Sequence, residues 1–172
     1  MDVWSTAGGA PLQTLVGHTD GVTALVLSAG GQRLYSGSYD NTVCVWSTAD
    51  GVPLQMLQGH TDGVFALALS ADGQLLYSGS LDYTVRVWST ADGAPLQTLQ
   101  GHTGGVVALA LSADGQRLYS GSGDTTVRVW STADGTLLQT LKVHTGGVRA
   151  LTLSADGQRL YSGARDNTVR LW

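Results

Sequence analysis

A histidine, a serine and an aspartate recur together in this sequence at fixed spacing, and these three residue types can form a hydrolytic site. In the first set they are His18, Ser36 and Asp40. A serine hydroxyl becomes a nucleophile when a histidine accepts its proton and a carboxylate orients that histidine. The set returns as His60, Ser78 and Asp82, as His102, Ser120 and Asp124, and as His144, Ser162 and Asp166.

Two observations argue against catalysis by these sets. An active site needs one well-placed set, whereas four sets with identical spacing are present. The sequence also lacks the strained turn that presents a nucleophilic serine in many hydrolases. Buried polar side chains are ordinarily hydrogen-bonded to one another. We therefore interpret the sets as structural networks and predict that the chain is not an enzyme.

The fixed spacing reflects an internal repeat of 42 residues. Tryptophan stands at positions 4, 46, 88, 130 and 172, with the same separation as the histidines. Residues 47–88 and 89–130 are identical at 35 of 42 positions, which indicates recent duplication or design. We assign the repeats to residues 5–46, 47–88, 89–130 and 131–172. Residues 1–4 are a stub of a preceding repeat, and we expect residues 1–172 to form a single structural segment built from these repeats.

Within each repeat the apolar side chains alternate with a period of two, which is typical of β-strands. This pattern predicts one set of four successive strands over Val22–Ser28, Arg33–Ser38, Thr42–Thr48 and Pro53–Gln58. Asp-Gly pairs such as Asp50-Gly51 lie between strands and suit the positive φ angles of tight hairpins. A sheet of four short strands cannot bury both of its faces alone, so the sheets must pack against one another. The predicted fold class is all-β, with four-stranded antiparallel sheets.

The repeat resembles the WD-repeat family. The resemblance is carried by the Gly17-His18 pair and its copies, by the aspartate in the turn, and by the closing tryptophan, and it covers all 168 repeated residues. It implies a β-propeller built from four-stranded blades. Two positions depart from the family pattern. Ser47 and its copies follow the tryptophan in place of aspartate, and Val143 replaces the glycine before His144.

The resemblance also implies a role for the recurring polar residues. In the family, the turn aspartate contacts the histidine, the histidine contacts a serine, and that serine contacts the tryptophan indole. We assign the first serine of each SGS or SGA sequence to this network, because Ser162 persists where the second serine becomes Ala164. The tryptophans of the four networks are Trp46, Trp88, Trp130 and Trp172.

Two of the 42 alignment columns carry a different residue in each of the four repeats, and a third column carries three different residues; we call these columns the variable positions. They hold Thr23, Phe65, Val107 and Arg149; Tyr39, Leu81, Gly123 and Arg165; and Asn41, Tyr83, Thr125 and Asn167. The resemblance places them on the top face of the propeller, around the central channel. Tyr and Arg are common anchors in protein interfaces, so we predict that these positions contact a partner. The alternative is drift at exposed positions.

Composition excludes several classes of function. The net charge is −4 and the nine Lys and Arg residues are scattered, so no basic stripe could hold nucleic acid. No apolar run is long enough to span a membrane, and the single cysteine, Cys44, fits a reducing compartment. We expect a cytoplasmic protein. Four histidines 42 residues apart cannot converge on one ion, so no metal or cofactor is predicted.

The number of repeats raises the question of how the ring closes. The chain opens at the end of a third strand and stops on a third strand, so we expect two copies to form one eight-bladed ring as a homodimer. A four-bladed ring of one chain is the alternative, and the ends of the chain suggest a fragment or an engineered piece of a longer bacterial-type array. The predicted function is a non-catalytic scaffold that binds an unknown protein or peptide. Two alternatives are an idealised repeat without a partner and an enzyme or small-molecule binder in the channel.

Overall fold

The computed structural model describes residues 1–142 and 144–172, which form strands joined by turns. The first strands are β1 (Asp2–Trp4), β2 (Pro11–Thr14), β3 (Val22–Leu27), β4 (Arg33–Ser38), β5 (Val43–Ser47) and β6 (Pro53–Leu57). They are followed by β7 (Val64–Leu69), β8 (Leu75–Ser80), β9 (Val85–Ser89), β10 (Pro95–Leu99), β11 (Val106–Leu111) and β12 (Arg117–Ser122). The last are β13 (Val127–Ser131), β14 (Leu137–Leu141), β15 (Val148–Leu153), β16 (Leu160–Ala164) and β17 (Val169–Leu171). None of these described residues belongs to a helix that could cross a membrane.

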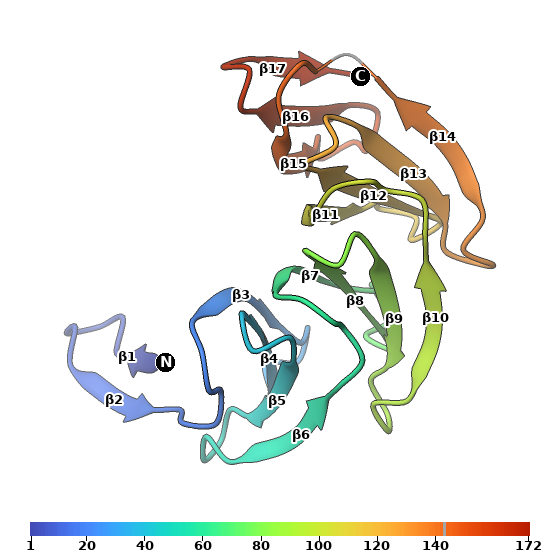
Figure 1. Ribbon diagram of the computed structural model, residues 1–172. Helices are drawn as coiled ribbons and strands as arrows, with labels where there is room; N and C mark the ends of the chain where they lie inside the picture. The colour runs from blue at the N-terminus through green and yellow to red at the C-terminus, as the bar shows by residue number, and fades with distance from the viewer. Residues whose placement is uncertain (143) are drawn as a thin grey trace.

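The strands form antiparallel sheets that follow the repeats. Three sheets have four strands, in the orders β3-β4-β5-β6, β7-β8-β9-β10 and β11-β12-β13-β14. β15-β16-β17 form a three-stranded sheet, and β1-β2 form a two-stranded one. The sheets follow one another around an open arc, with β1–β2 at one end and β17 at the other (Figure 1). The predicted all-β fold class with four-stranded antiparallel sheets is confirmed.

The turns of the second repeat show why short sheets form here. Gly51 and Gly73 adopt φ angles of 69° and 71°, in the left-handed region that favours glycine. In the turn before Gly73, the Asp72 carboxylate accepts hydrogen bonds from the Ser70 hydroxyl (2.5 Å) and the Gln74 amide (3.0 Å). The Asp-Gly pairs therefore reverse the chain as expected from the sequence.

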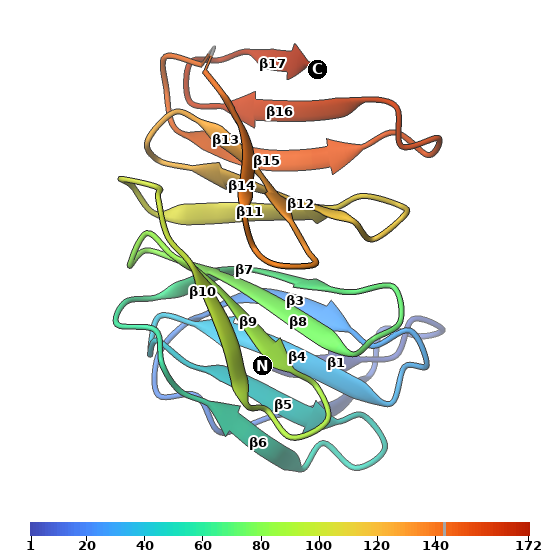
Figure 2. The same cartoon turned by 90° about the vertical axis from the view of Figure 1, so that its right-hand side faces the viewer.

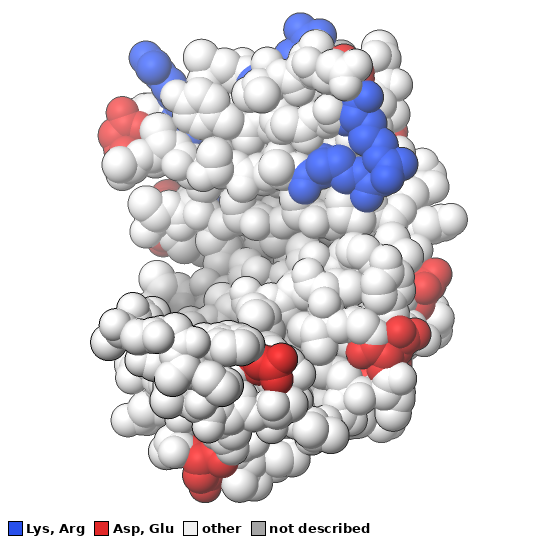
Figure 3. Space-filling model, turned by 90° about the vertical axis from the view of Figure 1, so that its left-hand side faces the viewer, with Lys and Arg blue, Asp and Glu red and all other residues white. Residues whose placement is uncertain are grey.

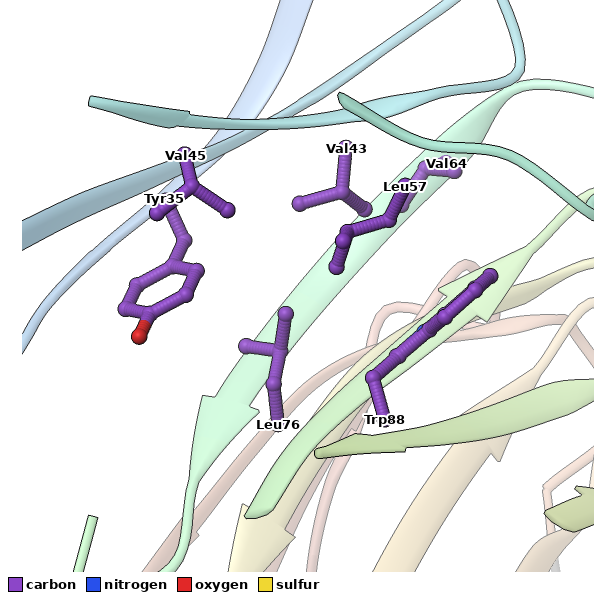
Figure 4. Close-up of a cluster of buried hydrophobic side chains, with 7 residues drawn as sticks. All are labelled: Tyr35, Val43, Val45, Leu57, Val64, Leu76 and Trp88. Carbon is purple, nitrogen blue, oxygen red and sulfur yellow. The ribbon is translucent and has the colours of Figure 1, made fainter. Parts of the chain in front are cut away.

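The core lies between successive sheets. In the first interface, Tyr35, Val43, Val45 and Leu57 of one sheet face Val64, Leu76 and Trp88 of the next (Figure 4). The second interface repeats the same positions, with Tyr77, Val85, Val87, Leu99, Val106, Leu118 and Trp130. Burial of this apolar surface is the main contribution to stability, at about 25 cal/mol per Å². Figure 2 shows the resulting stack of sheets from the side.

One glycine in each repeat allows this close packing. A Cβ atom added to Gly37 would lie 2.8 Å from a methyl group of Val64 in the next sheet, and one added to Gly79 would lie 2.8 Å from Val106. Gly121 stands in the same relation to Val148. A Cβ added to Gly163 would meet only Ala150, at 3.8 Å.

Candidate functional site

The polar residues of the first repeat form one continuous chain of hydrogen bonds. The Trp46 indole N–H lies 2.8 Å from Ser36 Oγ. Ser36 Oγ lies 2.7 Å from His18 Nε2, and His18 Nδ1 lies 2.8 Å from Asp40 Oδ2. The serine and tryptophan are on β4 and β5, the aspartate is in the turn between them, and the histidine precedes β3. The chain therefore links the loop before each sheet to its second and third strands.

The donors and acceptors of this chain fix the position of each proton. An indole N–H can only donate, so Ser36 Oγ accepts from Trp46. The Ser36 hydroxyl then donates its proton to His18 Nε2. The histidine carries its own proton on Nδ1 and donates it to the Asp40 carboxylate. Every polar atom of the chain has a partner, which removes the penalty of leaving it buried and unpaired.

The other three repeats contain the same chain. The histidine Nδ1 to aspartate distances are 2.7 Å for His60–Asp82, 2.7 Å for His102–Asp124 and 2.9 Å for His144–Asp166. The histidine Nε2 to serine distances are 2.7 Å at Ser78, 2.8 Å at Ser120 and 2.7 Å at Ser162. Trp88, Trp130 and Trp172 each donate to their serine at 2.8 Å.

These sets have the connectivity of a hydrolase triad, but they cannot act as one in this structure. Ser36, Ser78, Ser120 and Ser162 have no exposed surface, so no substrate can reach their Oγ atoms. The indole N–H also occupies the acceptor side of each Oγ. Attack on a carbonyl would require both exposure of the oxygen and loss of that hydrogen bond.

The aspartate of each chain accepts more hydrogen bonds than the sequence pattern indicated. Asp40 Oδ1 accepts from the Thr42 hydroxyl (2.6 Å) and amide (3.0 Å), and Oδ2 also accepts from the Thr19 amide (3.0 Å). Burial raises the pKa of Asp40, but the hydrogen bonds from Thr42, Thr19 and His18 outweigh it and lower the pKa to about 2. The pKa values of the other turn aspartates, Asp82, Asp124 and Asp166, are lowered through the same partners.

Two further residue types support the network and were missed at the sequence level. The threonine two residues after the aspartate, present in every repeat, holds the second carboxylate oxygen. The second serine of the SGS sequence also has a role, since Ser38 Oγ accepts from the Asp40 amide (3.1 Å) and donates to the Asp20 carbonyl (3.1 Å). The recurrence of threonine in all four copies was the available signal.

Glycine precedes the histidine because the tryptophan leaves no space for a side chain. A Cβ atom on Gly17 would lie 2.8 Å from the Trp46 ring, and one on Gly59 would lie 3.1 Å from the Trp88 ring. In the second and third repeats an arginine also lies over the indole, with 6.0 Å from Arg86 Cζ to the Trp88 centroid. The departure at Val143 falls outside the described residues.

The variable positions lie together at one end of the sheets. Gly21, just before β3, accepts a backbone hydrogen bond from Tyr39, which is in the β4–β5 turn. Tyr39 also crosses to the next sheet, where its ring meets Phe65 edge to face with 4.8 Å between centroids. Leu81 and Gly123 lie against Gly105 and Gly147 of the following sheets in the same way. The first two columns therefore interleave across neighbouring sheets.

The twelve variable positions differ in how freely they meet solvent. Tyr39 and Tyr83 are 51% and 50% exposed. The other exposed members are Gly123, Arg149, Arg165 and Asn167, and the half-buried members are Thr23, Asn41, Phe65, Leu81, Val107 and Thr125. Thr23 is turned inward, since its hydroxyl donates to the carbonyls of Gly37 (3.0 Å) and Val64.

The third variable column has a backbone requirement that its sequence did not indicate. Asn41, Tyr83, Thr125 and Asn167 have φ angles of 69°, 72°, 72° and 63°. This left-handed conformation suits asparagine and is strained for tyrosine and threonine. Within the described residues, no group of three or more histidine, cysteine or acidic side chains could hold a metal ion.

Comparison with known proteins places these observations in a family. A family model described as WD domain, G-beta repeat matches residues 9–47, 51–89, 93–131 and 135–172. The solved structure of U3-55K superposes with a TM-score of 0.87 and 32% sequence identity, over 93% of this chain and 51% of that chain. The crystal structure of RRP9 WD40 repeats gives 0.87 and 32%, over 93% of this chain and 50% of that chain. This chain thus spans about half the length of both. No curated protein sequence matches significantly.

Proposed function

Because this chain belongs to the WD40-repeat family, we propose that it is a non-catalytic scaffold that binds a protein or peptide through its variable positions. The family is in general a source of protein-interaction scaffolds. The observation that carries the proposal is the contrast within one short turn. Asp40 and its copies are held in an identical network, while the neighbouring Tyr39 position changes in every repeat and lies on the surface.

The side chains at the variable positions indicate the chemistry of the partner. Tyr39, Phe65, Leu81 and Tyr83 supply aromatic and apolar contacts on the first two repeats. Arg149 and Arg165 supply exposed positive charge on the last. Aromatic side chains bury much surface at low entropic cost, and arginine pairs with carboxylates. We therefore expect a partner segment that combines apolar and acidic residues.

Selection of binders from a random peptide library against the purified chain tests this proposal. We expect the selected peptides to lose at least ten-fold in affinity, about 1.4 kcal/mol, when Tyr39→Ala and Tyr83→Ala are combined. The matched control is Leu12→Ala with Leu96→Ala, because these leucines are similarly exposed but lie on the outer strands. Peptides that are indifferent to the tyrosines but sensitive to the leucines would overturn the proposed site.

For the assembly, the proposal is a homodimer in which two copies form one eight-bladed ring. The open arc of Figure 1 and the coverage of about half of two solved WD40 structures support it. In both cases about as much chain again would be needed to close a ring. The single cysteine is buried, and we propose a reducing, cytoplasmic setting. Light scattering tests the assembly, since a particle of 17.9 kDa at all concentrations would exclude it.

A further inference from the structure

The first and last sheets expose surfaces that are buried at every other position of the arc. Val22 is 38% exposed, whereas its counterparts Val64, Val106 and Val148 are fully buried. On the last sheet, Val169 is 72% exposed and Leu171 is 59% exposed. The residues equivalent to Val169 (Val43, Val85 and Val127) are fully buried, and those equivalent to Leu171 (Val45, Val87 and Val129) are 4–6% exposed. Among residues 1–142 and 144–172, Val22, Val169 and Leu171 therefore lack the apolar cover that their counterparts receive from a neighbouring sheet.

The stub, residues 1–4, already imitates the missing partner of the first sheet. β1 pairs with β2 as Asp2↔Thr14, Val3↔Gln13 and Trp4↔Pro11. The third and fourth strands of the next sheet pair as Cys44↔Met56, Val45↔Gln55 and Trp46↔Pro53. Each pair is displaced from its counterpart by one repeat of 42 residues. β1 thus stands where the third strand of a preceding sheet would stand.

The core packing of the stub supports the same reading. Met1 and Val3 pack against Leu15, Cys44 and Trp46. In the complete interfaces these two positions are held by valines of the third strand, such as Val43 and Val45. Met1 binds Leu15 through hydrogen bonds in both directions, of 3.0 Å from its terminal ammonium group and 2.7 Å to its carbonyl. Four repeat periods after Met1 and Val3, the corresponding positions are Val169 and Leu171.

We propose that β17 of a second copy displaces β1 and pairs with β2 in the register that β1 now occupies. Arg170 would face Thr14, Leu171 would face Gln13, and Trp172 would face Pro11 of the other copy. β2 then becomes the missing fourth strand of β15-β16-β17. This inference rests on the proposed homodimer and specifies its junction as a strand exchange, which occurs twice around a two-fold axis.

The charge distribution favours this head-to-tail junction. Residues 142–172 contain five of the nine basic residues and only Asp156 and Asp166, for a net charge of +3. The preceding 141 residues have a net charge of −7. In Figure 3 the Lys and Arg atoms lie over the upper end of the molecule, where Figure 1 places the last sheet, whereas Asp atoms are scattered over the face. The attraction between the positive last repeat and the negative remainder of a second copy steers the two copies together, and this attraction weakens with salt.

A further hydrogen bond would form at the same junction. In the present structure Gln13, Gln55 and Gln97 each donate from a fourth strand to the next sheet, at the carbonyls of Asp50, Asp92 and Asp134, all at 2.6 Å. Gln139 is the fourth member of this series. In the first three members the acceptor carbonyl lies 37 residues after the glutamine. For Gln139, the equivalent acceptor after strand exchange is the carbonyl of Gly8 of the second copy. The junction therefore continues both the packing and the polar contacts of the internal interfaces.

Disulfide trapping tests the register of the exchange. Gln13→Cys and Leu171→Cys would lie opposite each other across the new strand pair, close enough for a disulfide. The buried native thiol is removed with Cys44→Ala. After mild oxidation of the full chain, we expect a covalent species of twice 17.9 kDa on a non-reducing gel. The matched control, Gln13→Cys with Arg170→Cys, places the two thiols on opposite faces and is expected to trap at least ten-fold less.

The outcomes separate the strand exchange from the assembly. A disulfide within one chain would overturn exchange between copies. A dimer in light scattering that traps neither cysteine pair would overturn the exchange and leave the homodimer standing.

As a second test, removal of residues 2–4 deletes the competing strand, and we expect the dimer dissociation constant to fall at least ten-fold. An unchanged constant in a variant with an unaltered circular dichroism spectrum would contradict displacement of β1, whereas a monomer in every variant would exclude the homodimer itself.

Discussion

At the scale of the residue, the network shows that identical chemistry can be structural or catalytic according to what surrounds it. The Ser36 hydroxyl donates to a histidine that is oriented by a carboxylate, as a nucleophilic serine does. Its environment differs, because the Trp46 ring covers the oxygen and fills its acceptor site. The network therefore stabilises the fold, because it pairs buried polar atoms and links three segments of the chain.

Substitution of the carboxylate tests this value. Asp82→Ala leaves the His60 Nδ1–H and the Thr61 and Thr84 donors without their acceptor, so we expect the free energy of unfolding to fall by about 1–3 kcal/mol. The adjacent Leu81→Ala is the control, since this side chain is half-buried and makes no hydrogen bond, and it should cost about 1 kcal/mol or less. Urea unfolding of both variants measures the difference. Equal losses would contradict the separation of network and contact positions.

At the scale of the element, the β4–β5 turn and its copies combine a fixed backbone with a changing side chain. The residue after the aspartate is left-handed in all four turns, although only two of the four residues are asparagine. A left-handed tyrosine or threonine costs roughly 1–2 kcal/mol relative to the usual conformation. The turns of the second and third repeats therefore carry strain that the first and fourth avoid.

Exchange of these residues between turns measures the strain. We expect Tyr83→Asn to stabilise the protein by about 0.5–1 kcal/mol, because Asn tolerates the left-handed conformation and half of the Tyr83 surface is exposed to solvent. The reciprocal Asn41→Tyr should destabilise by a similar amount. The midpoints of urea unfolding report both changes. A loss of stability in Tyr83→Asn would show that its ring contacts outweigh the backbone strain.

The strands were easier to predict than the contacts between them. The period of two, together with the Asp-Gly turns, located β3–β6 to within a residue at either end, since alternation directly reflects the two faces of a sheet. Thr23 illustrates the limit. Its hydroxyl donates a hydrogen bond to the Val64 carbonyl of the next sheet, and Val64 is 41 residues away in sequence. Neither this contact nor the positive φ of Tyr83 leaves a pattern within one repeat.

At the scale of the whole molecule, the four hydrogen-bond networks are separate but equivalent. One network stabilises each of the four sheets that begin with β3, β7, β11 and β15. Each network contains a carboxyl group whose folded-state pKa is lowered, to about 2 for Asp40. In the unfolded chain the same group has a pKa of about 3.9. At pH values between the folded-state pKa and the unfolded-state pKa, the unfolded chain therefore binds more protons than the folded chain. The stability that the networks contribute is fully present above the unfolded-state pKa and is lost as the pH falls toward the folded-state pKa.

Thermal unfolding at different pH values tests this dependence. We expect the Tm to be nearly constant from about pH 7 to about pH 5 and to fall steadily between about pH 5 and about pH 2, because the lowered pKa values of the four aspartates make unfolding take up protons in this range. Asp82→Asn removes one titrating group and should make this decline shallower. Circular dichroism melts provide the measurement. A Tm that stays level down to about pH 3 would contradict the role assigned to the carboxylates.

The close approach at Gly37, Gly79 and Gly121 has a consequence for how such a gene can change. Because each glycine receives the same valine from the next repeat, this close contact is the same at each of these internal interfaces. Recombination between two misaligned copies of the coding sequence would add or remove 42 residues in frame. The product would keep the same glycine–valine contact at the new junction, so the number of repeats can change in a single genetic step without a change in this part of the core.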